Sequence, residues 1–376
     1  MSQADLAARL VRHIRAQGPL TVAAFMAMAL HDPAAGYYAR RQPLGWAGDF
    51  VTAPEISQIF GELVGLWCAD LWRRMGSPDP VVVAELGPGR GTLMADFVRA
   101  ATGVAGFRAA MRLHLVETSP ILRAEQRRRL AGIDAVWLDD IDGLPDGPLL
   151  LVANEFLDAL PIRQLVRGRA HWAERLVALD EKDRLCFAAG PENPALTLLV
   201  PPERHVAAPG TIVELCPAAA ALTASLAERL CRQPGAALFV DYGYADPSGK
   251  STLAAIGAHR AAAILDAPGT ADLSAHVDFA AVAAAARAGG ATVYGPVSQG
   301  AFLKALGAAL RLEILVRRAA PAQRAALEAG LKRLIDAAEM GTLFKALAMV
   351  SPGLPAPAGF ADCVEWPSND HPRRTR

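Results

Sequence analysis

Apolar positions recur along the chain at two spacings, which together predict helices alternating with buried strands. Leu6, Leu10 and Ile14 recur at helical spacing and would form the apolar face of an amphipathic helix. The segment 36–55 is punctuated by Gly and Pro and is expected to be a loop. The helical spacing predicts helices over 4–16, 21–30, 56–75, 279–288, 300–317 and 321–338.

Short apolar runs that end at turn residues predict strands of a mostly parallel sheet that is buried on both faces. The expected strands cover residues 81–85, 112–117, 135–138, 149–153, 236–243 and 343–349. Strands that alternate with helices in this way define an α/β, Rossmann-like fold. Residues 162–189 alternate in shorter runs around Gly168 and Asp180, a pattern typical of inserted β-hairpins.

The order of these elements predicts how the chain is organised. No internal repeat and no low-complexity linker interrupts it, so one sheet-containing domain with additions is expected. The expected parts are a helical cap over 1–80, the first half of the sheet domain over 81–161, an insertion with hairpins and a helix over 162–235, the second half with helical additions over 236–366, and a frayed tail over 367–376.

A glycine-rich turn follows the first of these strands and leads into a helix. Its Gly-x-Gly-x-Gly spacing differs from the G-x-G-x-x-G of dinucleotide sites, and an acidic residue stands just before it. A pyrophosphate would be repelled by that carboxylate, whereas a zwitterionic methionine tail and a sulfonium tolerate it. The turn therefore favours S-adenosylmethionine, with a turn that binds nothing as the alternative. The candidate residues are Glu85, Gly87, Pro88, Gly89, Gly91 and Thr92.

The next two strands also end in polar residues. Glu117 ends the second strand, where an acid grips the ribose hydroxyls in this architecture; a solvated loop carboxylate is the alternative. Asp140 and Ile141 follow the third strand. Asp140 would accept from the adenine amino group, and Ile141 would pack on the ring.

A polar cluster, Asn154, Glu155 and Asp158, follows the buried fourth strand, where open α/β sheets place their chemistry. If that turn is helical, Glu155 and Asp158 share one face. The alternative is that Asp158 caps a helix and Glu155 is merely solvated. Two further candidates, each with a structural alternative, are His276 as a base and Tyr242 as a pocket wall.

Composition narrows the function classes. The chain has 376 residues and a formal net charge of zero, which gives no general electrostatic attraction to nucleic acid or anionic membrane. Its five cysteines are scattered and form no C-x-x-C pair, so a reducing compartment and no metal site are expected. The N-terminus does not have the pattern of a signal peptide, and no segment is long and apolar enough to span a bilayer.

Five blocks, taken together, resemble one family of class I methyltransferases: the MidA-like proteins and the mitochondrial complex I assembly-factor methyltransferase. The blocks cover residues 48–62, 85–93, 154–161, 240–243 and 268–279. The resemblance implies a seven-stranded sheet with S-adenosyl-L-methionine as cofactor, and methylation of an arginine on a respiratory complex I subunit. In its first block, Asp49, Thr52 and Glu55 are expected to close over the cofactor, with a purely structural loop as the alternative.

An arginine substrate would explain why a polar cluster follows the fourth strand. Carboxylates that grip a guanidinium bidentately would aim one nitrogen and accept its proton, so Glu155 and Asp158 are the catalytic candidates, with Asn154 holding the cofactor end or orienting the loop. Two other classes stay open: a small-molecule O- or N-methyltransferase and a non-catalytic assembly chaperone. The expected location is the bacterial cytoplasm, or the mitochondrial matrix for a processed eukaryotic chain. The oligomeric state is left open, with a dimer as one option.

Overall fold

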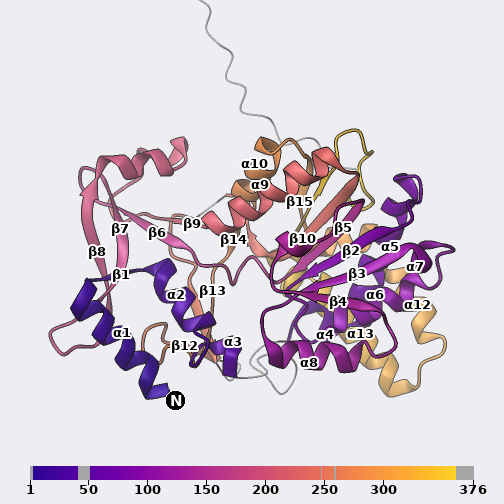
Figure 1. The fold of residues 1–376 in the computed structure, drawn as a ribbon, viewed down its shortest axis with the longest axis horizontal. Coiled ribbons are helices and arrows are strands. Elements are labelled where there is room, and N and C mark those ends of the chain that lie inside the picture. Colours follow the sequence, from indigo (N-terminus) through magenta and orange to yellow (C-terminus); the bar gives the residue numbers. More distant parts are fainter. Residues whose placement is uncertain (1–2, 41–50, 247, 258–259, 361–376) are drawn as a thin grey trace, which may run out of the picture.

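The computed structural model describes residues 3–40, 51–246, 248–257 and 260–360. Its centre is a twisted sheet in which seven strands run in the order β15-β16-β10-β5-β2-β3-β4, with the short β14 (Val277–Asp278) beside β10. β16 pairs antiparallel with both its neighbours, while the strands from β10 to β4 are parallel. The strands are β2 (Val81–Leu86), β3 (Met111–Val116), β4 (Ala135–Leu138), β5 (Leu149–Asn154), β10 (Gly235–Tyr244), β15 (Thr292–Ser298) and β16 (Phe344–Val350). The predicted α/β class and the seven-stranded sheet are confirmed (Figure 1).

Helices cover both faces of this sheet because its strands are apolar on both sides. On one face, α5 (Gln58–Arg74) and α6 (Thr92–Ala101) pack over Val83, Leu113 and Leu238. On the other face, α9 (Pro217–Arg232) and α10 (Phe279–Ala288) pack over Ala84, Leu151 and Phe239. Shorter elements lie in the connections: α7 (Phe107–Ala110), α8 (Pro120–Arg129) and the 3-10 turn Ile141–Gly143.

A second lobe lies beside the sheet, on the left of Figure 1. It contains an antiparallel sheet in the order β1-β7-β6-β9 with β8 beside β7, and the predicted hairpins are confirmed. Helices α1 (Gln3–Gln17) and α2 (Val22–His31) pack on this sheet, whereas α5 packs on α6. The domain boundaries stay a prediction. The strands are β1 (Leu20–Thr21), β6 (Arg163–Arg167), β7 (Trp172–Leu179), β8 (Leu185–Asn193) and β9 (Ile212–Leu215); 3-10 turns Pro194–Leu199 and Pro202–Arg204 follow β8.

Two expectations were wrong in detail, one strand was missed, and short strands lie in a segment for which no element was expected. The expected loop 36–55 contains two short helices, α3 (Tyr37–Arg40) and α4 (Ala53–Ile56). Strand β15 was missed because Gly295 and Pro296 interrupt its apolar pattern at a register shift. The helix expected over 300–317 is two helices, α11 (Gln299–Ala305) and α12 (Ala308–Val316), separated at Gly307 with φ of 85°. The segment 268–279 holds β13 (Asp272–Ser274), part of a small sheet with β11 (Ala254–Gly257) and β12 (Arg260–Ala262), as well as β14.

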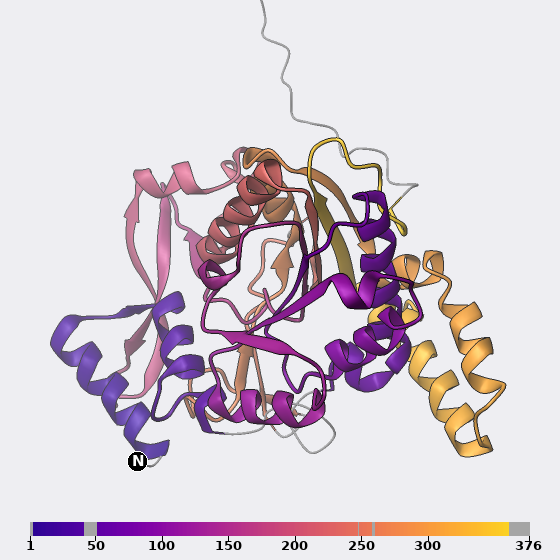
Figure 2. The same ribbon diagram turned by 45° about the vertical axis from the view of Figure 1, so that its right-hand side comes forward.

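The C-terminal helices project from the sheet domain as a hairpin. Helix α13 (Pro321–Ile335) packs against α12 and α4, and α14 (Met340–Leu343) leads into β16 (Figure 2). Within the described part of the chain, none of the helices is both long enough and apolar enough to cross a membrane.

Candidate active site

The glycine turn begins where β2 ends, and its backbone conformation requires glycine. Gly87, Gly89 and Gly91 have φ of 59°, 54° and 78°, in the left-handed region that side chains disfavour. A Cβ added to Gly87 would lie 2.8 Å from the Phe156 ring. Gln126 Nε2 donates to the Gly89 carbonyl over 2.7 Å and so holds the turn from behind. The turn is therefore fixed in a shape that leaves its front open to a ligand.

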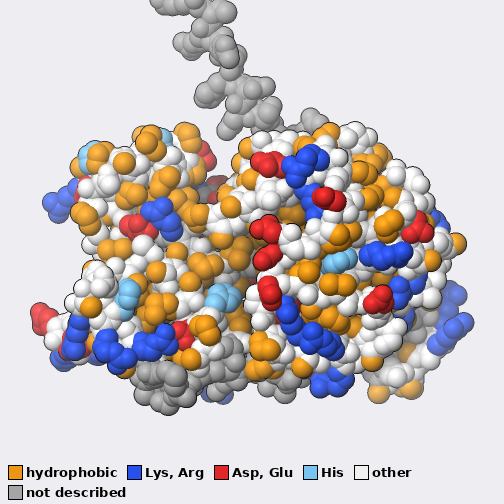
Figure 3. Space-filling view, viewed as in Figure 1, with side chains coloured by type: hydrophobic (Ala, Val, Ile, Leu, Met, Phe, Trp, Pro, Cys, Tyr) orange, Lys and Arg blue, Asp and Glu red, His pale blue; other side chains and the backbone are white. Residues whose placement is uncertain are grey.

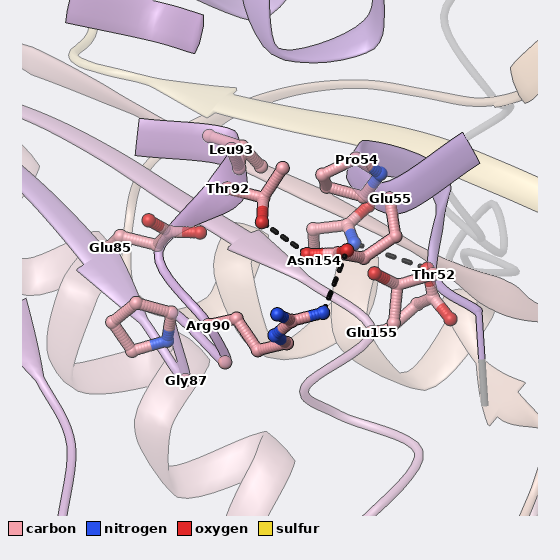
Figure 4. Close-up of a pocket in the computed structure, with 12 residues that line it drawn as sticks. Thr52, Pro54, Glu55, Glu85, Gly87, Arg90, Thr92, Leu93, Asn154 and Glu155 are labelled. Atoms are coloured by element: carbon pink, nitrogen blue, oxygen red, sulfur yellow. Dashed lines mark hydrogen bonds and ion pairs between the residues drawn. The ribbon is translucent and has the colours of Figure 1, made fainter. Parts of the chain in front are cut away.

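A cavity opens in front of this turn (Figure 4). At its floor lies Glu85, whose Oε2 is buried with no hydrogen-bond partner among the described residues. Burial and the nearby Glu117 raise the pKa of Glu85 to about 8. A buried carboxylate without a partner fits a cationic group, such as the ammonium of a methionine tail. The lining residues are Thr52, Pro54, Glu55, Glu85, Gly87, Pro88, Gly89, Arg90, Thr92, Leu93, Asn154 and Glu155.

The wall opposite Glu85 comes from α4. Glu55 accepts hydrogen bonds from the Thr92 hydroxyl at the start of α6 and from Arg90 Nη1, the latter over 3.3 Å (Figure 4). Arg90 Nε also donates to Glu125 over 2.9 Å. Thr52 and Glu55 thus lie at the cavity, while Asp49 falls outside the described residues. Whether the first two close over a cofactor stays a prediction.

A second cleft continues from the first on the other side of Gly87 and Gly89, with a volume of about 600 Å³. The expected nucleoside residues Glu117, Asp140 and Ile141 all line it. Figure 3 shows a hollow between the two lobes with acidic side chains along its border. One cavity is lined by residues expected to bind the methionine tail, and the other is lined by residues expected to bind the nucleoside. The two therefore meet at the glycine turn. Gly91 lines neither; it is the N-cap of α6 and faces Gln126.

The Glu117 carboxylate is held in place by its own neighbours. Its Oε1 accepts from the Ser119 N–H over 2.7 Å, and its Oε2 accepts from Gln126 over 3.3 Å. Burial raises the pKa of Glu117. Since a carboxylate oxygen can accept more than one hydrogen bond, both oxygens can still receive ribose hydroxyls. Its ribose role stays a prediction.

Sequence reasoning missed two aromatic residues of this cleft. His31 and Tyr38 line it, with their rings stacked at 5.6 Å between centroids. They come from α2 and α3, more than forty residues before the glycine turn along the chain. No sequence signal indicates a ligand-binding role at these positions, because they are far along the chain from the motifs that identify the cofactor turn.

The turn after β5 is not helical, so the condition under which Glu155 and Asp158 would share one helical face is not met. Glu155 has φ of 49°, a left-handed conformation that is unusual for a glutamate. Its Oε1 accepts from the Ala53 N–H over 3.0 Å and from Asn154 Nδ2 over 3.2 Å. Burial, with a smaller contribution from Asp158, raises the pKa of Glu155 to about 7.

Asp158 lies behind Glu155 and lines neither cavity. The Tyr242 hydroxyl donates to its Oδ2 over 2.6 Å, while its Oδ1 is buried without a partner among the described residues. Burial raises the pKa of Asp158 to about 6. Tyr242 in turn packs edge-on against His276, whose ring centroid lies 5.4 Å away. His276 lines neither of the two cavities described above and is linked to Asp158 only through Tyr242.

Asp241 is the most consequential residue that sequence reasoning overlooked. Its Oδ2 accepts from three successive backbone N–H groups, those of Phe156, Leu157 and Asp158, over 3.0 to 3.2 Å. Its Oδ1 accepts from the Tyr242 N–H over 2.9 Å. An acid at the end of a buried strand was the signal used for Glu85 and Glu117, and the same signal was present here. Asp241 therefore sets the shape of the carboxylate turn without lining the cavity.

We expect Asp241→Asn to lower methyl transfer more than cofactor affinity. An amide oxygen is a weaker acceptor than a carboxylate oxygen, and the amide NH2 would face an N–H group where the second oxygen now accepts, so the turn should shift, and the protein should lose about 1–3 kcal/mol of stability. Transfer rates and binding of S-adenosyl-homocysteine would be measured side by side. Glu192→Gln is the matched control, because Glu192 also accepts from three successive N–H groups, of residues 169–171, but far from the site. Equal transfer rates in both variants would contradict a positioning role.

The fold and the site together define the class of protein. A seven-stranded sheet with this strand order, a Gly-x-Gly-x-Gly turn after its first strand and acids at the ends of the first two strands make up a class I methyltransferase. Within the described residues no group of three or more His, Cys, Asp or Glu side chains is placed to hold a metal ion.

The chain belongs to the family described as "Putative S-adenosyl-L-methionine-dependent methyltransferase", whose pattern matches residues 63–297. It is 35% identical to the protein arginine methyltransferase NDUFAF7, mitochondrial, of Xenopus tropicalis, covering 94% of this chain and 88% of that protein. The human protein of the same name is also 35% identical, over 91% and 82% of the two chains. The family resemblance and its cofactor, S-adenosyl-L-methionine, are confirmed.

Two solved structures have the same overall fold as this chain. A protein from Burkholderia thailandensis bound to S-adenosyl-homocysteine is 29% identical, with a TM-score of 0.83 over 96% of this chain and 95% of that chain. A native structure from the same organism matches with a TM-score of 0.81 at 30% identity. The overall architecture, including the second lobe, is thus shared along almost the whole chain.

Proposed function

We propose that this methyltransferase modifies an arginine side chain of a protein, and that the protein is a subunit of respiratory complex I. The observation that carries the proposal is the set of buried carboxylates around the turn after β5. One oxygen of Asp158 is buried without a partner among the described residues, and the hydrogen bonds that Glu155 accepts there come from neutral groups. Buried, unpaired carboxylates favour cationic ligands. The names of the relatives and the resemblance to the complex I assembly factor point to the same substrate.

When bound, S-adenosyl-L-methionine supplies an electrophilic methyl group. The chain's own residues have to aim an acceptor nitrogen and remove its proton. A guanidinium is a poor nucleophile while its charge is delocalised, so the carboxylates must hold one nitrogen in line. Glu155 has Oε1 engaged and Asp158 has Oδ2 engaged, which leaves one oxygen on each. In this proposal the free oxygen of Glu155, which lines both cavities, receives the guanidinium, while Asp158, which lines neither, contributes negative charge from behind it.

Glu155 is the proton acceptor in this proposal, because it lines both cavities whereas Asp158 lies behind it. Asn154 donates to Glu155 and orients it, while its own Oδ1 is buried without a partner among the described residues. Tyr242 holds Asp158 from the other side.

The pH dependence follows from Glu155. A carboxyl accepts a proton only when ionised, and the pKa of Glu155 is about 7. We therefore expect kcat/KM to fall as the pH drops below about 7 and to level off above it, since kcat/KM reports groups of the free enzyme. Initial rates at low substrate concentration, from about pH 5.5 to 8.5, measure this. A profile that is flat across that range would contradict Glu155 as the base.

The direct test is mass spectrometry of complex I from cells with and without this protein. An arginine that is methylated only when the protein is present supports the proposal; no difference overturns the choice of complex I. Methylation of a small molecule instead would support the first alternative. A chain that does not bind S-adenosyl-homocysteine would support the chaperone. A bacterial cytoplasmic location is part of the proposal.

A further inference from the structure

We infer that a third cavity, between the second lobe and the sheet, receives an apolar side chain of the protein that carries the target arginine. This inference rests on the proposed function. The cavity measures about 330 Å³ and lies against α9, α10 and β9. Its walls are largely aliphatic and include Leu157, Ile162, Leu215, Ala220, Val277 and Val282.

The surface at the mouth of this cavity indicates a macromolecule rather than a small ligand. Leu199 lines the cavity, and its neighbour Leu198 is 87% exposed. A small molecule inside the cavity would leave these side chains in water. A docked polypeptide would cover them. Apolar surface that continues from a cavity to the exterior, as it does from Leu199 to Leu198, is typical of interaction sites, whereas single exposed apolar side chains are ordinary.

The cavity shares a wall with the carboxylate turn. Leu157, in the wall, directly precedes Asp158 along the chain. Ala275, also in the wall, donates its N–H to the Asp158 carbonyl over 3.0 Å. His276 lines the cavity and contacts Tyr242, which holds Asp158. A protein that presents an arginine to this turn therefore has neighbouring side chains within reach of the cavity.

A mostly apolar pocket bordered by the exposed Leu198 and Leu199 has the features of an interface hot spot, in which one buried anchor contributes most of the affinity. We therefore assign the cavity to an aliphatic or aromatic anchor on the substrate protein. The anchor should determine how tightly the protein substrate binds without changing the chemical step.

The test fills the cavity with Ala220→Phe. The matched control is Ala218→Phe, two residues away on the same helix, where the side chain is exposed and does not line the cavity. The substrates are unmethylated complex I from cells that lack this protein, and a short acetylated peptide holding only the target arginine between glycines. For complex I we expect Ala220→Phe to raise KM about tenfold or more with kcat nearly unchanged, and to leave the glycine peptide unaffected.

A second pair of variants changes surface residues outside the cavity, so this part of the test does not depend on whether the cavity tolerates a larger side chain. Leu198→Asp changes an exposed residue at the mouth of the cavity. The control, Leu310→Asp, changes a residue on α12 whose side chain is 62% exposed. Only the first should raise KM for complex I. Binding of S-adenosyl-homocysteine checks that each variant is folded.

The outcomes separate the explanations. Unchanged KM in both Ala220→Phe and Leu198→Asp overturns the inference. Equal slowing on complex I and on the glycine peptide also overturns it, because the cavity would then act on the turn through His276. A change in oligomeric state with Leu198→Asp would assign the surface to a second copy and overturn it as well. A wild-type chain that methylates neither substrate overturns the proposed function, and this inference with it.

Discussion

Gly89→Leu is expected to weaken binding of S-adenosyl-homocysteine by more than about 100-fold, which corresponds to about 2.7 kcal/mol. Gly89 lines both the methionine-tail cavity and the nucleoside cleft, so a side chain there would occupy the space where the ligand crosses the turn. Its φ of 54° also strains any residue with a Cβ. Calorimetry on the purified variant measures the effect.

A control variant has to separate the effect of backbone strain at Gly89 from the loss of space for the ligand. Gly132→Leu is the matched control, because Gly132 has φ of 82° and open space around it but lies in the turn after α8, outside both cavities. Both variants should lose comparable stability, and only Gly89→Leu should lose affinity. If Gly89→Leu binds as tightly as the wild type, the turn is not the cofactor site.

Glu155→Gln should retain cofactor affinity and lose methyl transfer by about 10²–10⁴-fold. Glutamine keeps the shape of the side chain and an oxygen that accepts from the Ala53 and Asn154 donors, so the local structure should survive. It cannot accept the proton of the guanidinium. Single-turnover rates with saturating cofactor measure the chemical step directly.

Glu328→Gln, an equivalent change on an exposed face of α13, is the control and should leave the rate unchanged. A Glu155→Gln variant with full activity would remove Glu155 from the catalytic residues. Full loss of cofactor binding would instead indicate that Glu155 acts on the cofactor, since it lines both cavities.

The sheet and the cofactor turn could be predicted from the sequence because their signals are local. The central strands are mostly apolar runs, interrupted in β3 by Arg112 and His114, and polar residues stand where the runs end, at Glu85, Glu117 and Asn154. Parallel strands bring those ends to one edge of the sheet, so neighbours in space follow from positions along the chain. Strand β15 lacked that signal, since Gly295 and Pro296 interrupt it.

The rest of the site depends on contacts between distant segments, which no local pattern encodes. The tie between Glu55 and Thr92 and the three hydrogen bonds of Asp241 join elements that are far apart in sequence. The left-handed conformation of Glu155 also has no sequence signal, because glycine is the residue expected there. The roles of Asp158 and His276 depend on which side chains lie between them and the cavities. Only the packing of the folded chain determines this.

The reach of Asp241 bears on how the protein matures during synthesis. The backbone N–H groups of Phe156, Leu157 and Asp158 have their acceptor only after the ribosome has added Asp241, 83 to 85 residues later. A ribosome-bound fragment that ends before β10 can already contain the whole cofactor turn, while its reactive turn has no partner to shape it. The carboxylate turn can therefore take its observed shape only after the fifth strand has been made and has joined the sheet.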